Sequence, residues 1–438
     1  MRSQGTLMLA ASVLALAAPL RASYLLTAGK VGTFGRASDG LPTALVRVTG
    51  DPVLRELPDP RCPARSTVGF AFATQAQVRT DHGETVLPCA NWHATASGFR
   101  YHDPSGAAAG VRDILYGPGH LLVRAGGPSL TAVMGPVIYV EAFLAVGTRH
   151  WVVRLYDFRR NDAERIVSRR PSHTAAAAEA ATWDSLWGSA AREAPALALL
   201  AKAIKERPSD GRSQFYLGAL HMYRAARAFY SGHLDAAALA EQRAALAPLD
   251  RAAELLPHDS VPKVFRAFTT YLNGIFDQDA DETARGLALM EEATTENLFF
   301  NKAVDLFILP IFMSGSSDYY QSHLMPWLDD VYNDAVAHPD VYPDVFTSRL
   351  VPHDPESAML MFGDVALKGG RLDLAARYYG LAQAFGKPAG YPFESIADSR
   401  LADVEARLAA HETAAPSDGG MPGVSGVSPC TLCHYGAR

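Results

Sequence analysis

The feature that most constrains the fold of this 438-residue chain is a change of hydrophobic pattern at Pro171. Before this residue, short alternations of apolar and polar residues are broken by Gly and Pro, which is typical of β-strands. After it, an Ala-rich segment at 172–181 leads into apolar residues spaced by three and four up to about His411, which indicates helices. We therefore predict a multidomain protein, with an all-β N-terminal region followed by an all-α region.

The first region, residues 23–160, is predicted to be a β-sandwich or barrel. Asp81-His82-Gly83 and Gly126-Gly127-Pro128 are turn signals between strands. The candidate strands are 44–48, 68–78, 98–102, 119–124, 137–145 and 150–156.

Two of the four cysteines, Cys62 and Cys89, lie in this region and form a natural pair. In an oxidising compartment a structural disulfide is more stable than two free thiols, so we predict that bond, with Trp92 packed around it.

Four polar residues of the same region invite a metal or catalytic interpretation: His82, His93, His102 and Asp103. Their spacing does not force them to converge, and we predict that His93 and His102 are ordinary surface or turn residues. No Ser-His-Asp or paired-carboxylate pattern stands out, so we do not predict an enzyme here.

The net charge of −6 gives no reason to expect nucleic acid as a partner. A local basic run is interpreted as a solvated domain edge: Arg154, Arg159, Arg160, Arg165, Arg169 and Arg170.

The helical region contains an internal repeat of small and large residues. The same spacing occurs in Ala196, Leu200, Ala203 and Pro208, and in Ala245, Leu249, Ala252 and Pro257. In a helix the first three members of each set share one face, and the proline ends the unit.

A fuller copy of this unit occurs at 357–388, and it resembles the tetratricopeptide repeat. Met359, Phe362, Gly363 and Ala366 fill the first-helix positions, and the second helix supplies Ala375, Tyr379 and Ala382. The resemblance implies an α-solenoid over residues 182–411, after a linker at 161–181, that binds protein partners in its groove. The aromatics of this region are interpreted chiefly as interhelical packing: Tyr216, Tyr223, Tyr230, Tyr271, Tyr319 and Tyr320.

An acidic cluster at Asp277, Asp279, Asp281 and Glu282 is interpreted as a solvated loop. It lacks the glycine and the final glutamate of a calcium-binding loop.

Residues 1–22 have the pattern of a secretory signal peptide, with Arg2 followed by a short apolar stretch and small residues. Export to the periplasm or the cell surface is the predicted localisation.

The chain ends in Cys430-Thr431-Leu432-Cys433-His434 and four further residues. Cys-x-x-Cys-His is the attachment motif of c-type haem, so Cys430 and Cys433 are predicted to form the thioethers and His434 to be the proximal iron ligand. The alternatives are a reversible disulfide, part of a zinc site, or a chance match. Residues 412–429 are rich in Gly, Pro and Ser, so the haem c would sit in a tail, 430–438, on a flexible linker.

The sixth iron ligand stays open at this stage. The candidates are Met421, His411, His353, Met359 and Met361, and five-coordinate iron is a further alternative.

The resulting hypothesis is an exported electron carrier with one covalent haem c, which docks a redox protein through its repeat region. A non-redox periplasmic scaffold or assembly factor is the alternative, and a haem enzyme is a third. Peripheral membrane association stays open.

Overall fold

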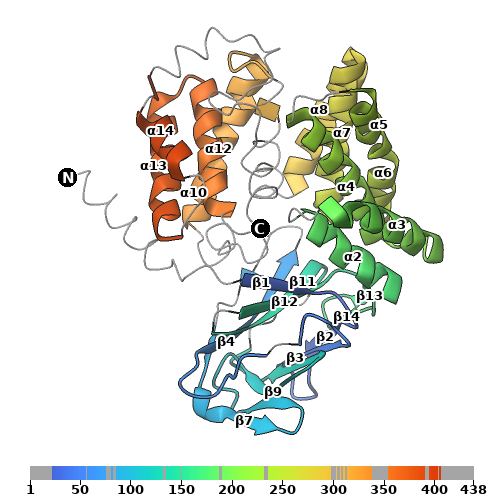
Figure 1. Cartoon of the computed structure of the whole chain (residues 1–438), viewed down its shortest axis with the longest axis vertical. Coiled ribbons are helices and arrows are strands. Elements are labelled where there is room, and N and C mark those ends of the chain that lie inside the picture. Colours follow the sequence, from blue (N-terminus) through green and yellow to red (C-terminus); the bar gives the residue numbers. More distant parts are fainter. Residues whose placement is uncertain are drawn as a thin grey trace.

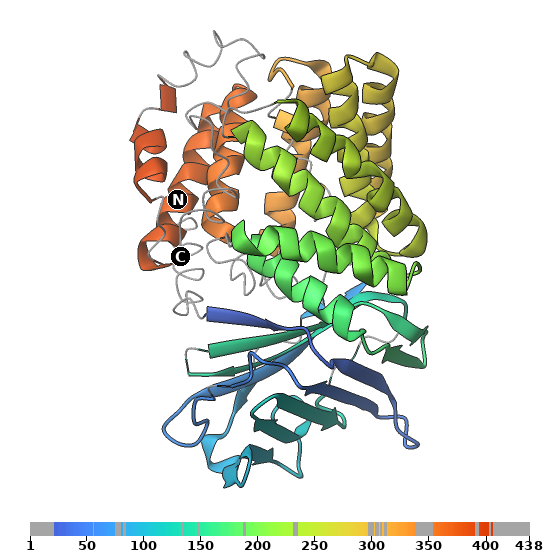
Figure 2. The same cartoon turned by 45° about the vertical axis from the view of Figure 1, so that its right-hand side comes forward.

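The computed structural model describes most of residues 22–405. Outside it lie residues 1–21 and 406–438, and the internal positions 56, 75–79, 82–84, 131, 133–134, 148, 187–189, 231–234, 297–301, 303–305, 307–308, 311–312, 338–353, 390–393 and 403. The strands occupy one end of the molecule and the helices stack above them (Figures 1 and 2).

A six-stranded sheet contains the first strand of the described chain. Its order is β1-β12-β11-β4-β5, and β6 also pairs with β4. β1 runs parallel to β12, and the other pairs are antiparallel. The bounds are β1 Ala22–Leu26, β4 Ser66–Thr74, β5 Thr80–Asp81, β6 Thr85–Leu87, β11 Val137–Val146 and β12 Arg149–Leu155.

An eight-stranded sheet has the order β13-β14-β2-β3-β10-β9-β8-β7. All its pairs are antiparallel. Its strands are β2 Val31–Arg36, β3 Pro42–Thr49, β7 Trp92–Thr95, β8 Gly98–His102, β9 Val111–Gly117, β10 His120–Gly126, β13 Phe158–Asn161 and β14 Arg165–Ser168.

The two sheets share one apolar core. Phe34 of the larger sheet meets Phe72 of the smaller sheet edge to face, with ring centroids 5.3 Å apart, and Tyr116 meets Trp151 at 5.2 Å. In β3 the residues Ala44, Val46 and Val48 are buried while those between them face outward, as the two-residue period of a strand requires.

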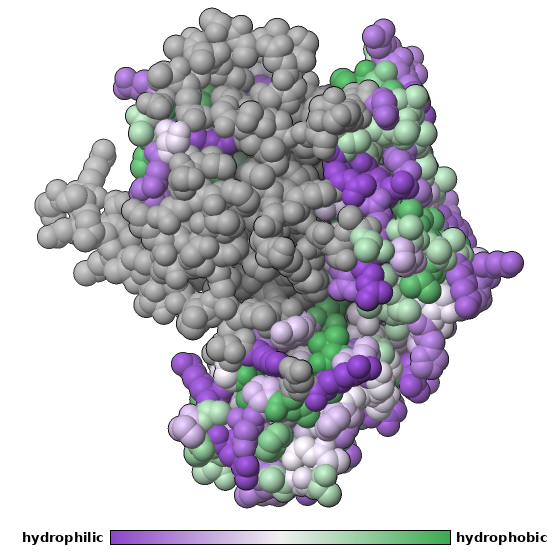
Figure 3. Space-filling view, in the orientation of Figure 1, coloured by the Kyte–Doolittle hydropathy of each residue, from purple (hydrophilic) through white to green (hydrophobic). Residues whose placement is uncertain are grey.

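The helices follow in the order α2 His173–Leu186, α3 Ala190–Glu206, α4 Gly211–Tyr230, α5 Ala236–Ala244, α6 Leu246–Leu255, α7 Ser260–Asp277, α8 Ala280–Glu296, α10 Met325–Ala337, α12 Asp354–Lys368, α13 Leu372–Ala389 and α14 Glu394–Ala402. A single π-helical turn, η2 (Tyr320–Leu324), leads directly into α10. On the coloured surface of Figure 3, hydrophilic and hydrophobic residues are intermixed over both the strands and the helices.

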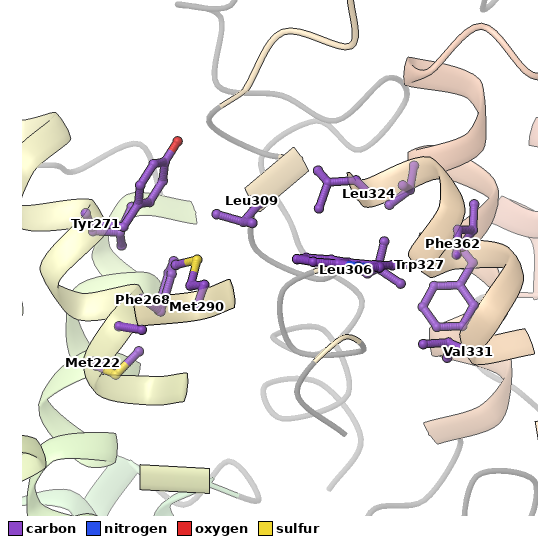
Figure 4. Close-up of a cluster of buried hydrophobic side chains, with 14 of the residues drawn as sticks. Met222, Phe268, Tyr271, Met290, Leu306, Leu309, Leu324, Trp327, Val331 and Phe362 are labelled. Atoms are coloured by element: carbon purple, nitrogen blue, oxygen red, sulfur yellow. The ribbon is translucent and has the colours of Figure 1, made fainter. Parts of the chain in front are cut away.

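One apolar core runs through both groups of helices. Phe268 and Tyr271 on α7 lie on one side, and Trp327 on α10 lies on the other (Figure 4). Leu306 and Leu309, both fully buried, lie between them. The helical region is therefore packed as one body rather than as two separate bundles.

The packing of α8 against α7 depends on the close approach of their backbones at Gly286. A Cβ atom there would lie 2.4 Å from the backbone nitrogen of Tyr271 on the neighbouring α7. We expect Gly286→Ala to lower the free energy of unfolding by about 2 kcal/mol, because the two backbones must separate. Gly380→Ala is the matched control, since nothing lies within 4 Å of a Cβ at Gly380. It should raise stability by about 0.5–1 kcal/mol through helix propensity. Urea titrations that show equal effects for the two variants would contradict this assignment.

The coarse prediction of a β-rich region followed by helices is confirmed. Neither sheet closes on itself over the described strands, so the barrel alternative is wrong. Six predicted strands correspond to β3, β4, β8, β10, β11 and β12, while β1, β2, β5, β6, β7, β9, β13 and β14 were not predicted. The residues with the repeated spacing are buried. Ala196 and Leu200 on α3, and Leu249 and Ala252 on α6, are fully inaccessible, as is Ala245 between α5 and α6.

The predicted disulfide is present between Cys62 and Cys89, with Cα atoms 5.0 Å apart. Trp92 is buried nearby, and its indole N–H donates to Ser66 Oγ at 2.9 Å.

Candidate functional site

The haem-attachment residues Cys430, Cys433 and His434 lie outside the described residues, as do the predicted signal peptide and linker. Of the candidate sixth ligands, Met421, His411 and His353 lie outside as well. Met359 and Met361 are on α12, each 1% exposed. Met359 belongs to the helical core, so its thioether packs against apolar side chains.

Across the described ranges, no three His, Cys, Asp or Glu side chains lie together so as to hold a metal ion. The same residues include no helix long and apolar enough to cross a membrane.

A cavity of about 100 Å³ lies beside β4 in the strand region. Its lining has no titratable side chain and consists of Val68, Gly69, Phe70, Ala109, Val111, Ser129 and Leu130. Such a site offers apolar contact and the hydroxyl group of Ser129, with no titratable acid or base beside it.

The structure describes three of the four polar residues of the strand region that invited a metal or catalytic interpretation. His93 and His102 are exposed on neighbouring strands. Asp103 accepts hydrogen bonds from the backbone N–H groups of Ser105 and Ala107, and the hydroxyl of Ser105, which also donates to it, lowers the pKa of this carboxyl group. His82 lies outside the described residues.

The basic run contains one residue that was misassigned. Arg154 donates two hydrogen bonds to the buried carboxylate of Glu141, at 2.6 and 2.9 Å, so it is not part of a solvated edge. The two residues are cross-strand neighbours on β12 and β11, a pairing that requires knowledge of the register.

The acidic cluster spans the junction of α7 and α8: Asp277 ends α7, Asp279 lies between the helices, and Asp281 and Glu282 lie in the first turn of α8. Asp279 accepts from the backbone N–H groups of Asp281 and Glu282, as an N-cap does, while Asp277 pairs with Arg243 of α5. Asp279 therefore caps the N-terminus of α8.

A buried polar network joins the strands to the helices. Lys30, between β1 and β2, donates to Glu179 of α2 with Nζ and Oε2 2.6 Å apart. Tyr216 of α4 donates to the other oxygen of Glu179 at 3.3 Å, and its hydroxyl also lies 3.3 Å from that of Tyr156. Burial, together with these oxygens, raises the pKa of Tyr216 well above its usual range. We call these four residues the junction network.

The junction network continues into the helices through Arg212. Its guanidinium lies 4.0 Å from the ring centroid of Tyr156 and donates to Asp259 at 2.7 Å. Every cation here has a carboxylate partner, and every carboxylate has a donor. This arrangement fixes the two regions against each other.

A second polar cluster lies on α3, α4 and α5. Glu193 accepts from Arg224 and Arg227, and Arg224 also pairs with Glu241. Glu241 lies 2.6 Å from Nδ1 of His221. Metal-binding histidines commonly have such a carboxylate on the second nitrogen, but within the described residues no further ligand accompanies His221. Sequence analysis missed this pair because its members come from different helices.

No known protein-family model, no curated protein and no solved structure matches the chain. The predicted resemblance to a tetratricopeptide-repeat protein with a c-type haem motif is therefore wrong, because no family model supports either part of it. The described residues form a two-sheet region followed by helices, and they contain no group of metal ligands. Burial of small and apolar residues at spacings of three and four is a property of helix packing in general, which is why it did not identify a family.

Proposed function

We propose that this protein is exported and carries one covalently bound haem at its C-terminus, through which it exchanges electrons with a partner protein. The proposal rests on one observation, the terminal sequence Cys430-x-x-Cys433-His434, and on no family membership. Two thiols three positions apart can each bond one haem vinyl group, and the adjacent imidazole then lies at the iron.

Export is the condition for this chemistry, and two observations support it. The first residues have the composition of a secretory signal, and the Cys62–Cys89 disulfide is compatible with an oxidising compartment. The continuous core of the helices supplies a rigid body from which a tail could present the group to a partner.

The test is expression of the full chain in a bacterium with the haem c maturation machinery. We expect a covalent haem band on a denaturing gel, a pyridine haemochrome spectrum and a mass increased by one haem. Cys430→Ser with Cys433→Ser should abolish all three signals while leaving the far-UV circular dichroism unchanged. The matched control, Cys62→Ser with Cys89→Ser, removes the other cysteine pair and should keep the haem. Wild-type protein from the periplasm without haem would refute the proposal.

The alternative function is a non-redox scaffold that binds protein partners through its helical surface. It predicts that partner binding persists in the Cys430→Ser and Cys433→Ser variant. Loss of both the haem and the binding partner in that variant would exclude the scaffold function.

A further inference from the structure

The outer face of the eight-stranded sheet carries an array of arginines and leucines on four neighbouring strands. Opposite residues in one row across β3, β10, β9 and β8 are Arg47, Leu122, Leu115 and Arg100. The adjacent row contains Leu45, Arg124, Asp113 and His102. We call these eight residues the arginine face. It extends about 14 Å across the strands, since neighbouring strands lie about 4.8 Å apart.

The three arginines of the arginine face are exposed to solvent, while Leu115 and Leu122 are half-buried and Asp113 is buried. The side chain of Arg124 is 60% exposed, and Leu45, at 38%, is among the few large apolar residues with such exposure in the described part of the chain. The opposite side of the same strands is buried in the core between the sheets. The apolar residues of the arginine face are therefore not needed for that core.

The charges of the arginine face are not balanced. Asp113 is its single carboxylate, and it lies 2.8 Å from Arg100, 3.7 Å from Arg124 and 3.9 Å from His102. Arg47 has no ion pair with any residue that the structure describes. Three guanidinium groups against one carboxylate leave an excess of two positive charges, interleaved with leucines.

The whole chain reinforces this polarity. Residues 22–170 contain 17 Lys and Arg against 12 Asp and Glu, a formal charge of +5. Residues 171–438 contain 21 against 34, a formal charge of −13. An acidic molecule that approaches is thus repelled by the helical region and attracted to the strand region, which orients the encounter.

We propose that the arginine face is a docking surface for an acidic protein surface, whose carboxylates meet Arg47, Arg100 and Arg124 and whose apolar residues meet the three leucines. Arginine is favoured at such interfaces because its planar guanidinium group can donate two parallel hydrogen bonds to one carboxylate. This inference goes beyond the proposed function and does not depend on the haem.

The probe for the test is a fluorescein-labelled oligoglutamate peptide, titrated with the full-length protein and followed by fluorescence anisotropy. We expect binding at low ionic strength that weakens strongly at 0.3 M salt, about twice the physiological value, because exposed charges are then screened. Arg47→Glu with Arg124→Glu should weaken binding about tenfold or more. The matched control, Arg251→Glu with Arg285→Glu, makes the same charge change at exposed arginines of α6 and α8 and should retain most of the affinity.

Four outcomes would overturn the inference: no salt-sensitive binding by the wild type, equal loss in the two double variants, equal binding of an oligolysine peptide, or self-association of the wild type that requires Arg47 and Arg124 in sedimentation velocity. The last outcome would make a second copy the occupant. Because Arg124→Glu places a carboxylate beside Asp113, Arg47→Gln with Arg124→Gln is the variant to measure if the first pair unfolds at lower temperature.

Discussion

Lys30→Met is expected to lower the free energy of unfolding by about 3–5 kcal/mol. The side chains of Lys30 and Glu179 are 5% and 8% exposed, and their charged atoms lie 2.6 Å apart. Removal of the ammonium group leaves the carboxylate of Glu179 buried with the hydroxyl of Tyr216 as its remaining donor. An uncompensated buried charge has a cost of this size, because the protein interior solvates it poorly.

A urea titration followed by circular dichroism measures the effect, and two further variants interpret it. Lys202→Met removes an exposed cation that lies 3.9 Å from Glu206, so it should change stability by less than about 0.5 kcal/mol. Lys30→Met with Glu179→Met removes both charges and should recover most of the loss, since apolar replacement of a buried pair is often neutral. If Lys30→Met lowers the free energy of unfolding no more than Lys202→Met does, the buried ion pair of Lys30 and Glu179 does not stabilise the contact between the strands and the helices.

Cys62→Ser with Cys89→Ser is expected to lower the free energy of unfolding by about 3.5 kcal/mol. The disulfide joins two residues with a sequence separation of 27. Without it, the unfolded chain gains conformational entropy that stabilises the unfolded state by about that amount. The loop includes β4, which pairs with β11, so we expect the six-stranded sheet to be destabilised.

The measurement compares the thermal and urea unfolding of the oxidised wild type with those of the variant. Reduction of the wild type with dithiothreitol should reproduce the variant's stability, whereas Cys430→Ser with Cys433→Ser serves as a control that leaves the disulfide in place. If the reduced protein and the variant unfold at the same urea concentration as the oxidised protein, the disulfide does not stabilise the fold.

Much of the fold was accessible from local pattern. The alternation in Pro42–Thr49 predicted a strand, because a strand that covers a core with one face must alternate. Val137–Val146 is instead a nearly continuous apolar run and is buried along almost its whole length. The spacing of Ala245, Leu249 and Ala252 predicted a buried helix face. The strands that were missed are short or differ from this rule. Phe158–Asn161, for example, is four residues long, and its pairing with Arg165–Ser168 is what makes it a strand.

The sequence by itself determined the order of the two regions, the cysteine pair and the terminal Cys-x-x-Cys-His, because each of these depends on residue type and on spacing along the chain. The tertiary structure alone decided the contacts between distant residues. Lys30 and Glu179 are 149 positions apart, and Arg47, Arg100 and Arg124 share one face only because the four strands β3, β10, β9 and β8 pair in a particular register. Local sequence does not specify such contacts, since they arise when separate elements bury their apolar faces against one another.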